Sequence, residues 1–182
     1  MSTILKKSAT GLGVVGVISL GVVAAVIVSL SAGAASAETG TKSDETQWIA
    51  PEAAPEIFNR SVETFTEPLP DGISWPEALS PDLLEEDVRM EKEVPLAVTS
   101  FYWLCAWEDT YLQQLGAGDV EASKASLETI DSFVDMPFYK NHFDDPEMVW
   151  YNAVIGAAKA GDPSGIQSNL DGCHYYWANQ PS

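Results

Sequence analysis

The segment Phe101-Tyr-Trp-Leu-Cys-Ala-Trp-Glu-Asp109 is the most aromatic stretch of this sequence. Together with the next residues it places Trp103, Trp107 and Tyr111 at i, i+4 and i+8, on one face of an α-helix. Such a ridge can stack on sugars or grip a peptide if it is exposed. If neighbouring helices and the aromatic tail that ends at Trp177 cover the ridge, it belongs to the hydrophobic core instead. We favour the core interpretation and keep the other open, with Trp103, Trp107, Tyr111 and Trp177 as candidate binding residues.

Helix boundaries are marked on both sides of this segment. Four residues are candidate N-caps, and proline follows three of them at the first helical position: Ser80, Asp119, Asp145 and Asp162. Glycines mark the expected helix ends: Gly116, Gly161 and Gly172. No stretch shows the period-2 alternation of a β-strand. The pattern therefore predicts an all-α fold, a small and mostly antiparallel bundle of about five helices, at 81–93, 96–115, 120–134, 146–160 and 163–170.

The chain contains two cysteines, Cys105 and Cys173. An even count in an exported chain favours one disulfide over two free thiols. Neither cysteine belongs to a C-x-x-C pair, which argues against a thioredoxin-like redox role and against a zinc site. We expect a Cys105–Cys173 bridge that fastens the C-terminal tail across the bundle.

The N-terminus has the pattern of an export segment. Lys6 and Lys7 precede an uncharged, apolar stretch of about 20 residues, and small residues follow up to Glu38. Ala35 and Ala37 satisfy the A-x-A pattern of a signal-peptidase site, which predicts cleavage and secretion. The alternative is an uncleaved helix that anchors the chain in the membrane with its N-terminus inside. Either interpretation places the rest of the chain outside the cytoplasm.

Charge is distributed unevenly along the chain. All 27 acidic residues lie from Glu38 onward, together with seven of the nine basic residues. Nucleic-acid phosphates and anionic membrane surfaces would repel such an acidic body, which argues against nucleic-acid binding and restricts membrane contact to the N-terminal segment. The charge also favours solubility through self-repulsion.

Three regions follow from these patterns. Residues 1–37 are a signal peptide or membrane anchor, 38–73 a proline-rich acidic linker or arm, and 74–182 a helical extracytoplasmic domain. Seven of the 11 prolines fall between Pro51 and Pro95, and proline-rich acidic segments tend to be extended. Asp71-Gly72 is the expected corner of a turn at the end of the arm.

Few residues suggest catalysis. Glu108 follows Trp107 and could be a partly buried general acid with a raised pKa, but its neighbour Asp109 diverges from it on a helix, whereas glycosidase chemistry needs two converging carboxyl groups. Serine-hydrolase, phosphate-loop, dinucleotide, calcium-loop and zinc-protease motifs are missing from the sequence. We therefore predict no catalytic residue, no cofactor and no metal.

The runs Leu69-Pro-Asp-Gly-Ile-Ser-Trp-Pro76 and Phe101–Glu108 resemble small exported proteins of high-GC Gram-positive bacteria. The resemblance implies an extracytoplasmic helical domain behind a proline-rich arm, and it supplies no activity or site residues. The sequence as a whole favours a non-enzymatic cell-envelope or secreted protein that interacts with a protein or peptide. The alternatives are a carbohydrate- or cell-wall-binding module that uses Trp103, Trp107 and Trp177, and an acidic hydrolase that uses Glu108.

Overall fold

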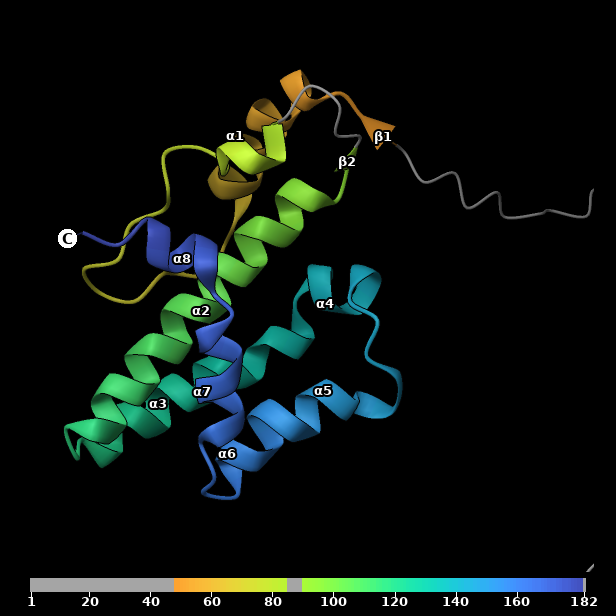
Figure 1. Ribbon diagram of the computed structural model, residues 1–182. Helices are drawn as coiled ribbons and strands as arrows, with labels where there is room; N and C mark the ends of the chain where they lie inside the picture. The colour runs from red at the N-terminus through yellow and green to blue at the C-terminus, as the bar shows by residue number, and fades with distance from the viewer. Residues whose placement is uncertain (1–47, 85–89, 182) are drawn as a thin grey trace, which may run out of the picture. The chain divides into compact units, whose positions relative to one another are not determined.

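The longest helix, α2 (Val94–Gly116), runs through the centre of the fold and packs against α1, α3, α7 and α8 (Figure 1). The computed structural model describes residues 48–84 and 90–181. Pro95 stands in the first turn of α2, where a missing N–H costs nothing. Most of the helix is apolar, and ten of its residues are buried, as expected for an element covered on several sides.

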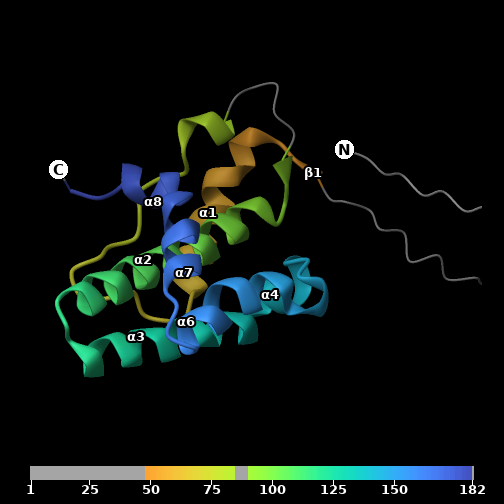
Figure 2. The same cartoon turned by 60° about the horizontal axis from the view of Figure 1, so that its bottom comes forward.

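Helix α3 (Val120–Asp131) returns along α2 as the second half of a hairpin, which Figure 2 shows from below. The turn uses Gly118, whose φ of 75° suits glycine, and the side chain of Asp119, which accepts a hydrogen bond from the Ala122 N–H at 3.1 Å. The chain then continues through a 3₁₀ turn, η3 (Ser132–Asp135), into the short helix α4 (Pro137–His142).

The C-terminal half is a series of short helical segments: η4 (Pro146–Met148), α5 (Val149–Tyr151), the π-helical η5 (Asn152–Gly156), α6 (Ala157–Lys159), α7 (Ser164–Asp171) and α8 (His174–Ala178). Gly161, with φ 96°, ends α6, and the Asp162 side chain accepts from the Ser164 N–H to start α7. α7 then crosses close to the π-helical segment, with Gly165 at the contact.

The N-terminal part adds one helix and a minimal sheet. Its elements are β1 (Trp48–Ile49), η1 (Pro51–Ala53), α1 (Ala54–Thr64), η2 (Pro81–Leu84) and β2 (Met90–Glu91). β1 and β2 pair antiparallel, with Ile49 opposite Met90. Phe58 of α1 is 1 % exposed and packs in a small cluster with Met90 and Leu79, so α1 is part of the folded body.

Aromatic residues fill the main core. Phe133 lies at its centre, with ring centroids of six other aromatic residues within 6.5 Å: Phe101, Trp103, Phe138, Tyr139, Phe143 and Trp150. Edge-to-face and tilted pairs of this kind contribute about 0.5–1.5 kcal/mol each beyond the burial of their area. The core therefore joins α2, η3, α4 and α5.

The predicted all-α class is confirmed for the described residues, apart from the two-residue strands. The predicted helices at 96–115, 120–134 and 163–170 correspond to α2, α3 with η3, and α7. The predicted helix at 146–160 exists as η4 through α6, with Val154, Ile155 and Ala158 buried and Val149 62 % exposed.

The predicted helix at 81–93 is wrong. In the described residues of this range, Pro81–Leu84 form the 3₁₀ turn η2 and Met90–Glu91 form β2, which pairs with β1. The buried Met90 side chain packs against Phe58 and Leu79. The extended arm predicted over 38–73 also differs from the structure, which has helix α1 at 54–64. Pro55 occupies the first turn of α1, where proline is tolerated.

The predicted export segment, residues 1–37, lies outside the described residues. No helix within 48–84 and 90–181 combines the length and the apolar character needed to cross a bilayer.

Candidate functional site

The aromatic ridge of α2 is mostly structural. Trp103 is 0 % exposed and Tyr111 5 %, whereas Trp107 is half-buried. The indole N–H groups of Trp103 and Trp107 both donate to the Pro68 carbonyl, at 2.9 and 3.0 Å. The ridge thus fastens the segment that follows α1, and the core interpretation is right for Trp103 and Tyr111.

Trp177 differs from the other candidate binding residues. It is 45 % exposed on α8, and its indole N–H donates to the Leu170 carbonyl at 3.1 Å. The structure separates it from the buried face of the ridge, so the four aromatic residues do not form one exposed stacking surface.

The predicted disulfide between Cys105 and Cys173 is confirmed, with a Cα–Cα distance of 6.1 Å. It joins the middle of α2 to the residue between α7 and α8. The two sulfur atoms and a Glu108 oxygen lie within 4.8 Å of one another, but the sulfurs are bonded to each other and offer no thiolate to a metal. A buried disulfide is typical of an oxidising, extracytoplasmic compartment.

Glu108 is fully buried. Burial raises its pKa to about 8, against the opposing effect of a hydrogen bond from Asn169. The neighbouring Asp109 has a different partner, the hydroxyl of Tyr176, which donates to it at 2.7 Å. The two carboxyl groups therefore do not converge, and the enclosed Glu108 cannot reach a substrate in this structure.

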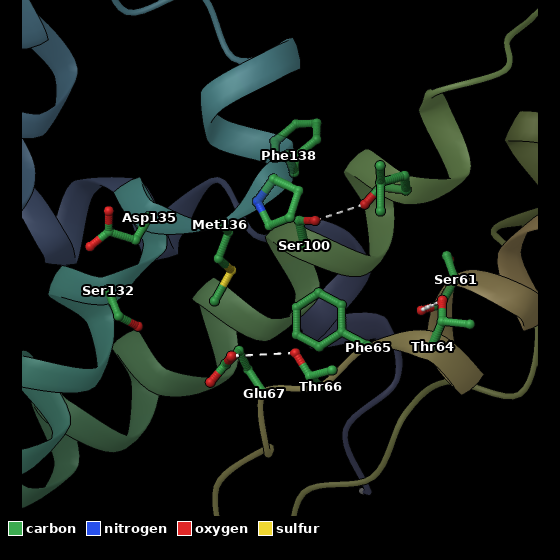
Figure 3. A pocket seen from close by; sticks show the side chains of 12 residues that line it. Ser61, Thr64, Phe65, Thr66, Glu67, Ser100, Ser132, Asp135, Met136 and Phe138 are labelled. Atoms are coloured by element: carbon green, nitrogen blue, oxygen red, sulfur yellow. Dashed lines mark hydrogen bonds between the residues drawn. The ribbon is translucent and has the colours of Figure 1, made fainter.

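A pocket of about 370 Å³ lies between the end of α1, the first half of α2 and the η3–α4 connection (Figure 3). This volume is near the lower end of the range of about 300–1,000 Å³ that ligand pockets occupy. Its apolar wall consists of five side chains: Phe65, Leu96, Met136, Pro137 and Phe138. Hydroxyl and carboxyl groups form the rest of the lining.

The hydroxyl groups of this pocket mostly use their protons within their own helices. Thr64 donates to the Arg60 carbonyl at 2.8 Å, Ser100 to that of Leu96 at 2.9 Å, and Ser132 to that of Thr129 at 2.7 Å. A hydroxyl has one proton and two acceptor lone pairs, so these oxygens can accept further hydrogen bonds but have no free proton to donate.

Two carboxyl groups complete the lining, Glu67 and Asp135, and both residues are exposed. Asp135 accepts a hydrogen bond from Lys140 at 2.9 Å, in an ion pair whose side chains are 77 % and 56 % exposed. No lysine, arginine, histidine, asparagine or glutamine of the described residues lines the pocket. The lining is therefore rich in acceptors and carries two carboxyl groups, of which Asp135 is paired with Lys140 at the surface.

Two other cavities have fewer carboxyl groups in their linings. One, of about 400 Å³, is bounded by the Cys105–Cys173 disulfide and by Phe101 and Tyr176, with His174 at its edge. Another, of about 680 Å³, lies between the 72–81 segment and the C-terminal residues that follow α8. Neither combines an apolar wall with two carboxyl groups.

The cations of the described residues are all paired. Each of the five lies within 4.0 Å of a carboxylate: Arg60 with Glu56, Lys92 with Glu93, Lys124 with Glu128, Lys140 with Asp135, and Lys159 with Asp131. Acidic groups are far more numerous than these five cations. The surface built by residues 48–84 and 90–181 therefore attracts cations and repels anions.

Sequence reasoning missed the pocket residues. Glu67, Ser100 and Asp135 come from three separate segments, and no spacing rule connects them. The available signal was the excess of acidic residues, which gives the sign of the surface charge without locating a site. Comparison with protein-family models, curated proteins and solved structures finds no match to this chain.

Proposed function

We propose that this chain is an extracytoplasmic, non-enzymatic module that binds a positively charged segment of a partner protein or peptide. The observation that carries the proposal is the large excess of carboxyl groups over the five cations of residues 48–84 and 90–181, each of which already lies within 4.0 Å of a carboxylate. An anionic partner therefore meets net repulsion at long range, whereas a cationic partner meets attraction.

Two further observations support a binding role over catalysis. The carboxyl group with catalytic promise, Glu108, is enclosed and has Asn169 as its partner. The cysteines are joined in a disulfide, so they supply no nucleophile.

A carbohydrate-binding role has less support than protein or peptide binding. Of the aromatic residues that would stack on a sugar, Trp103 has no exposed surface.

The experiment is a binding titration of the full chain, purified in a non-ionic detergent, with peptides of matched length that are cationic, neutral or anionic. We expect saturable one-to-one binding of a cationic peptide at physiological ionic strength, with an affinity that falls as salt is added. The neutral and anionic peptides should not bind. Equal binding of cationic and anionic peptides, or binding of neither, would overturn the proposal.

We also propose that the export segment is removed after Ala37, so that the acidic body is released from the membrane. The A-x-A pattern of Ala35 and Ala37 supports cleavage, and the disulfide supports an oxidising compartment. Mass spectrometry of the mature N-terminus tests this. A chain that begins at Glu38 is diffusible, whereas one that retains Lys6 and Lys7 is anchored, which is the alternative.

A further inference from the structure

We propose that the pocket between α1, α2 and α4 binds the guanidinium group of an arginine side chain in a peptide. The inference rests on the proposed function, because it names the site and the chemical group through which a cationic partner is held. It depends on three properties of the pocket: the direction of its hydrogen bonds, its charge and its apolar wall (Figure 3).

The direction of the hydrogen bonds selects a donor. Thr64, Ser100 and Ser132 donate their hydroxyl protons to backbone carbonyls of their own helices. Their oxygens can therefore accept further hydrogen bonds but have no spare proton to donate. Ser61 likewise donates to the Phe58 carbonyl, and Thr66 donates to the Glu67 carboxylate over a longer 3.4 Å contact. A carboxylate or phosphate ligand would therefore meet mostly acceptors, whereas a ligand with several N–H groups would find partners for them.

The charge of the pocket selects a cation. Glu67 and Asp135 lie on the lining, and the Lys140 ammonium that pairs with Asp135 is itself 56 % exposed. Exposed ion pairs of this kind contribute little, so an incoming guanidinium can replace Lys140 without a large penalty. A planar guanidinium can also form two parallel hydrogen bonds with one carboxylate, which an ammonium cannot do.

The arrangement of the acceptors favours arginine over lysine. Figure 3 shows Ser132, Asp135 and Glu67 on one side of the Phe65 ring and Ser61 and Thr64 on the other. Arginine presents five N–H donors in a fixed, spread fork, whereas lysine concentrates three donors on one nitrogen. The wall formed by Phe65, Met136 and Phe138 suits the aliphatic stem and the flat, weakly hydrated guanidinium.

The test is calorimetric titration of the full chain in a non-ionic detergent with three capped pentapeptides, Gly-Gly-Xaa-Gly-Gly, where Xaa is arginine, lysine or citrulline. Citrulline keeps the shape of arginine but is neutral. We expect the citrulline peptide to bind at least about tenfold more weakly than the arginine peptide, because its binding lacks the charge-assisted hydrogen bonds. The lysine peptide should fall between them. Equal binding of the arginine peptide and either of the other two would overturn the assignment to guanidinium.

Variants locate the site. The double variant Glu67→Gln, Asp135→Asn removes both charges from exposed positions, so the fold is retained, and near-ultraviolet circular dichroism checks this. We expect at least about a tenfold loss of affinity for the arginine peptide. The matched control is Glu121→Gln, an exposed carboxyl at the opposite end of α3 from Ser132, which should keep the original affinity within about twofold.

The outcomes separate the two proposals. Binding of the arginine peptide that is equal in the double variant and in the original chain would overturn the site and leave the proposed function standing. Failure of every cationic peptide to bind would overturn both. Loss of binding in the double variant, with Glu121→Gln unaffected, supports both.

Discussion

The side-chain amide of Asn169 on α7 donates to both carboxyl oxygens of Glu108 on α2, at 3.0 and 2.9 Å. The indole N–H of Trp150 donates to the side-chain oxygen of Asn169 at 3.3 Å. This hydrogen bond orients the Asn169 amide so that its NH₂ group points toward Glu108. The Cys105–Cys173 disulfide joins the same two parts of the chain one helical turn away. α2 and α7 are thus held by a covalent and a polar contact side by side.

The buried carboxyl should make stability depend on pH. The ordinary pKa of Glu108 is 4.5, and burial raises it to about 8 in the folded state. Between these values the unfolded chain is ionised while the folded chain keeps its proton. The contribution of Glu108 to stability is therefore complete below pH 4.5 and lost as pH rises to about 8, by at most about 1.4 kcal/mol per pH unit.

Glu108→Gln should abolish this dependence, because the amide does not ionise and its carbonyl still accepts from Asn169. Urea unfolding at pH 5, 6, 7 and 8 measures the effect, and at pH 8 we expect the variant to be more stable than the original chain. Glu121→Gln, which changes an exposed carboxyl, is the control and should keep the original pH profile. Parallel profiles for the Glu108→Gln variant and the original chain would contradict the prediction.

Removal of the disulfide should cost stability mainly through the unfolded state. Cys105 and Cys173 are separated by 68 positions, and the loop-entropy model assigns closure of a loop of this length about 4 kcal/mol. We expect the double variant Cys105→Ala, Cys173→Ala to lose up to about that amount in urea unfolding, together with the packing of both sulfurs.

A reductant provides the matching comparison. The original chain with a dithiol reductant should approach the stability of the double variant, and the variant itself should not respond. Identical unfolding midpoints for the original chain with and without reductant would show that the bridge adds nothing.

Local sequence rules predicted the parts of the fold that local chemistry determines. Asp119 caps α3 as expected, α2 ends at Gly116 as expected, and the Asp71-Gly72 turn closes with a hydrogen bond from the Ile73 N–H to the Pro70 carbonyl at 3.1 Å. The rules failed where distant segments decide the outcome. β2 forms because Ile49 lies opposite Met90, and nothing near Met90 in sequence indicates that partner.

The candidate site shows the same limit. The spacing of Trp103, Trp107 and Tyr111 correctly placed them along one helix, but it could not show that Pro68 would cover two of the indoles. The acceptor character of the pocket depends on which carbonyl each hydroxyl reaches. Ser100 and Ser132 look like ordinary helical serines until the tertiary structure places them around one cavity.

Gly165 should tolerate no side chain. A Cβ atom there would lie 2.2 Å from the Ala153 carbonyl oxygen and 2.9 Å from the Val154 Cα, both backbone atoms that cannot rotate away. Gly165→Ala should therefore push α7 away from the π-helical segment and destabilise the fold by about 1–3 kcal/mol or more. Gly116→Ala is the matched control, because nothing lies within 4 Å of its Cβ position. The midpoint of thermal unfolding should fall strongly for Gly165→Ala and should not fall for Gly116→Ala. Equal midpoints for the two variants would contradict the close contact between Gly165 and the backbone of Ala153 and Val154.

Asp145 caps the helical segment that begins after an unusual backbone stretch. Glu147 and Met148 have φ values of 58° and 55°, a left-handed conformation that costs non-glycine residues about 1–2 kcal/mol each. The Asp145 carboxylate offsets this cost by accepting from the backbone N–H groups of Trp150 and Tyr151, at 2.7 and 3.0 Å, and from the Tyr139 hydroxyl at 2.6 Å.

Asp145→Ala should therefore destabilise the fold by about 2 kcal/mol, at the upper end of the range for a lost cap, because three donors lose their acceptor together. Burial opposes ionisation of Asp145, but the hydrogen bonds outweigh it and lower its pKa below the ordinary 3.8. The contribution of the Asp145 carboxylate to stability is therefore present above pH 3.8 and is lost as the pH falls through its lowered pKa in the folded state. Urea unfolding at pH 7 and at pH 2.5 should show a gap between the original chain and Asp145→Ala that narrows in acid. A gap of constant size would mean that the charge of Asp145 does not hold this helix start.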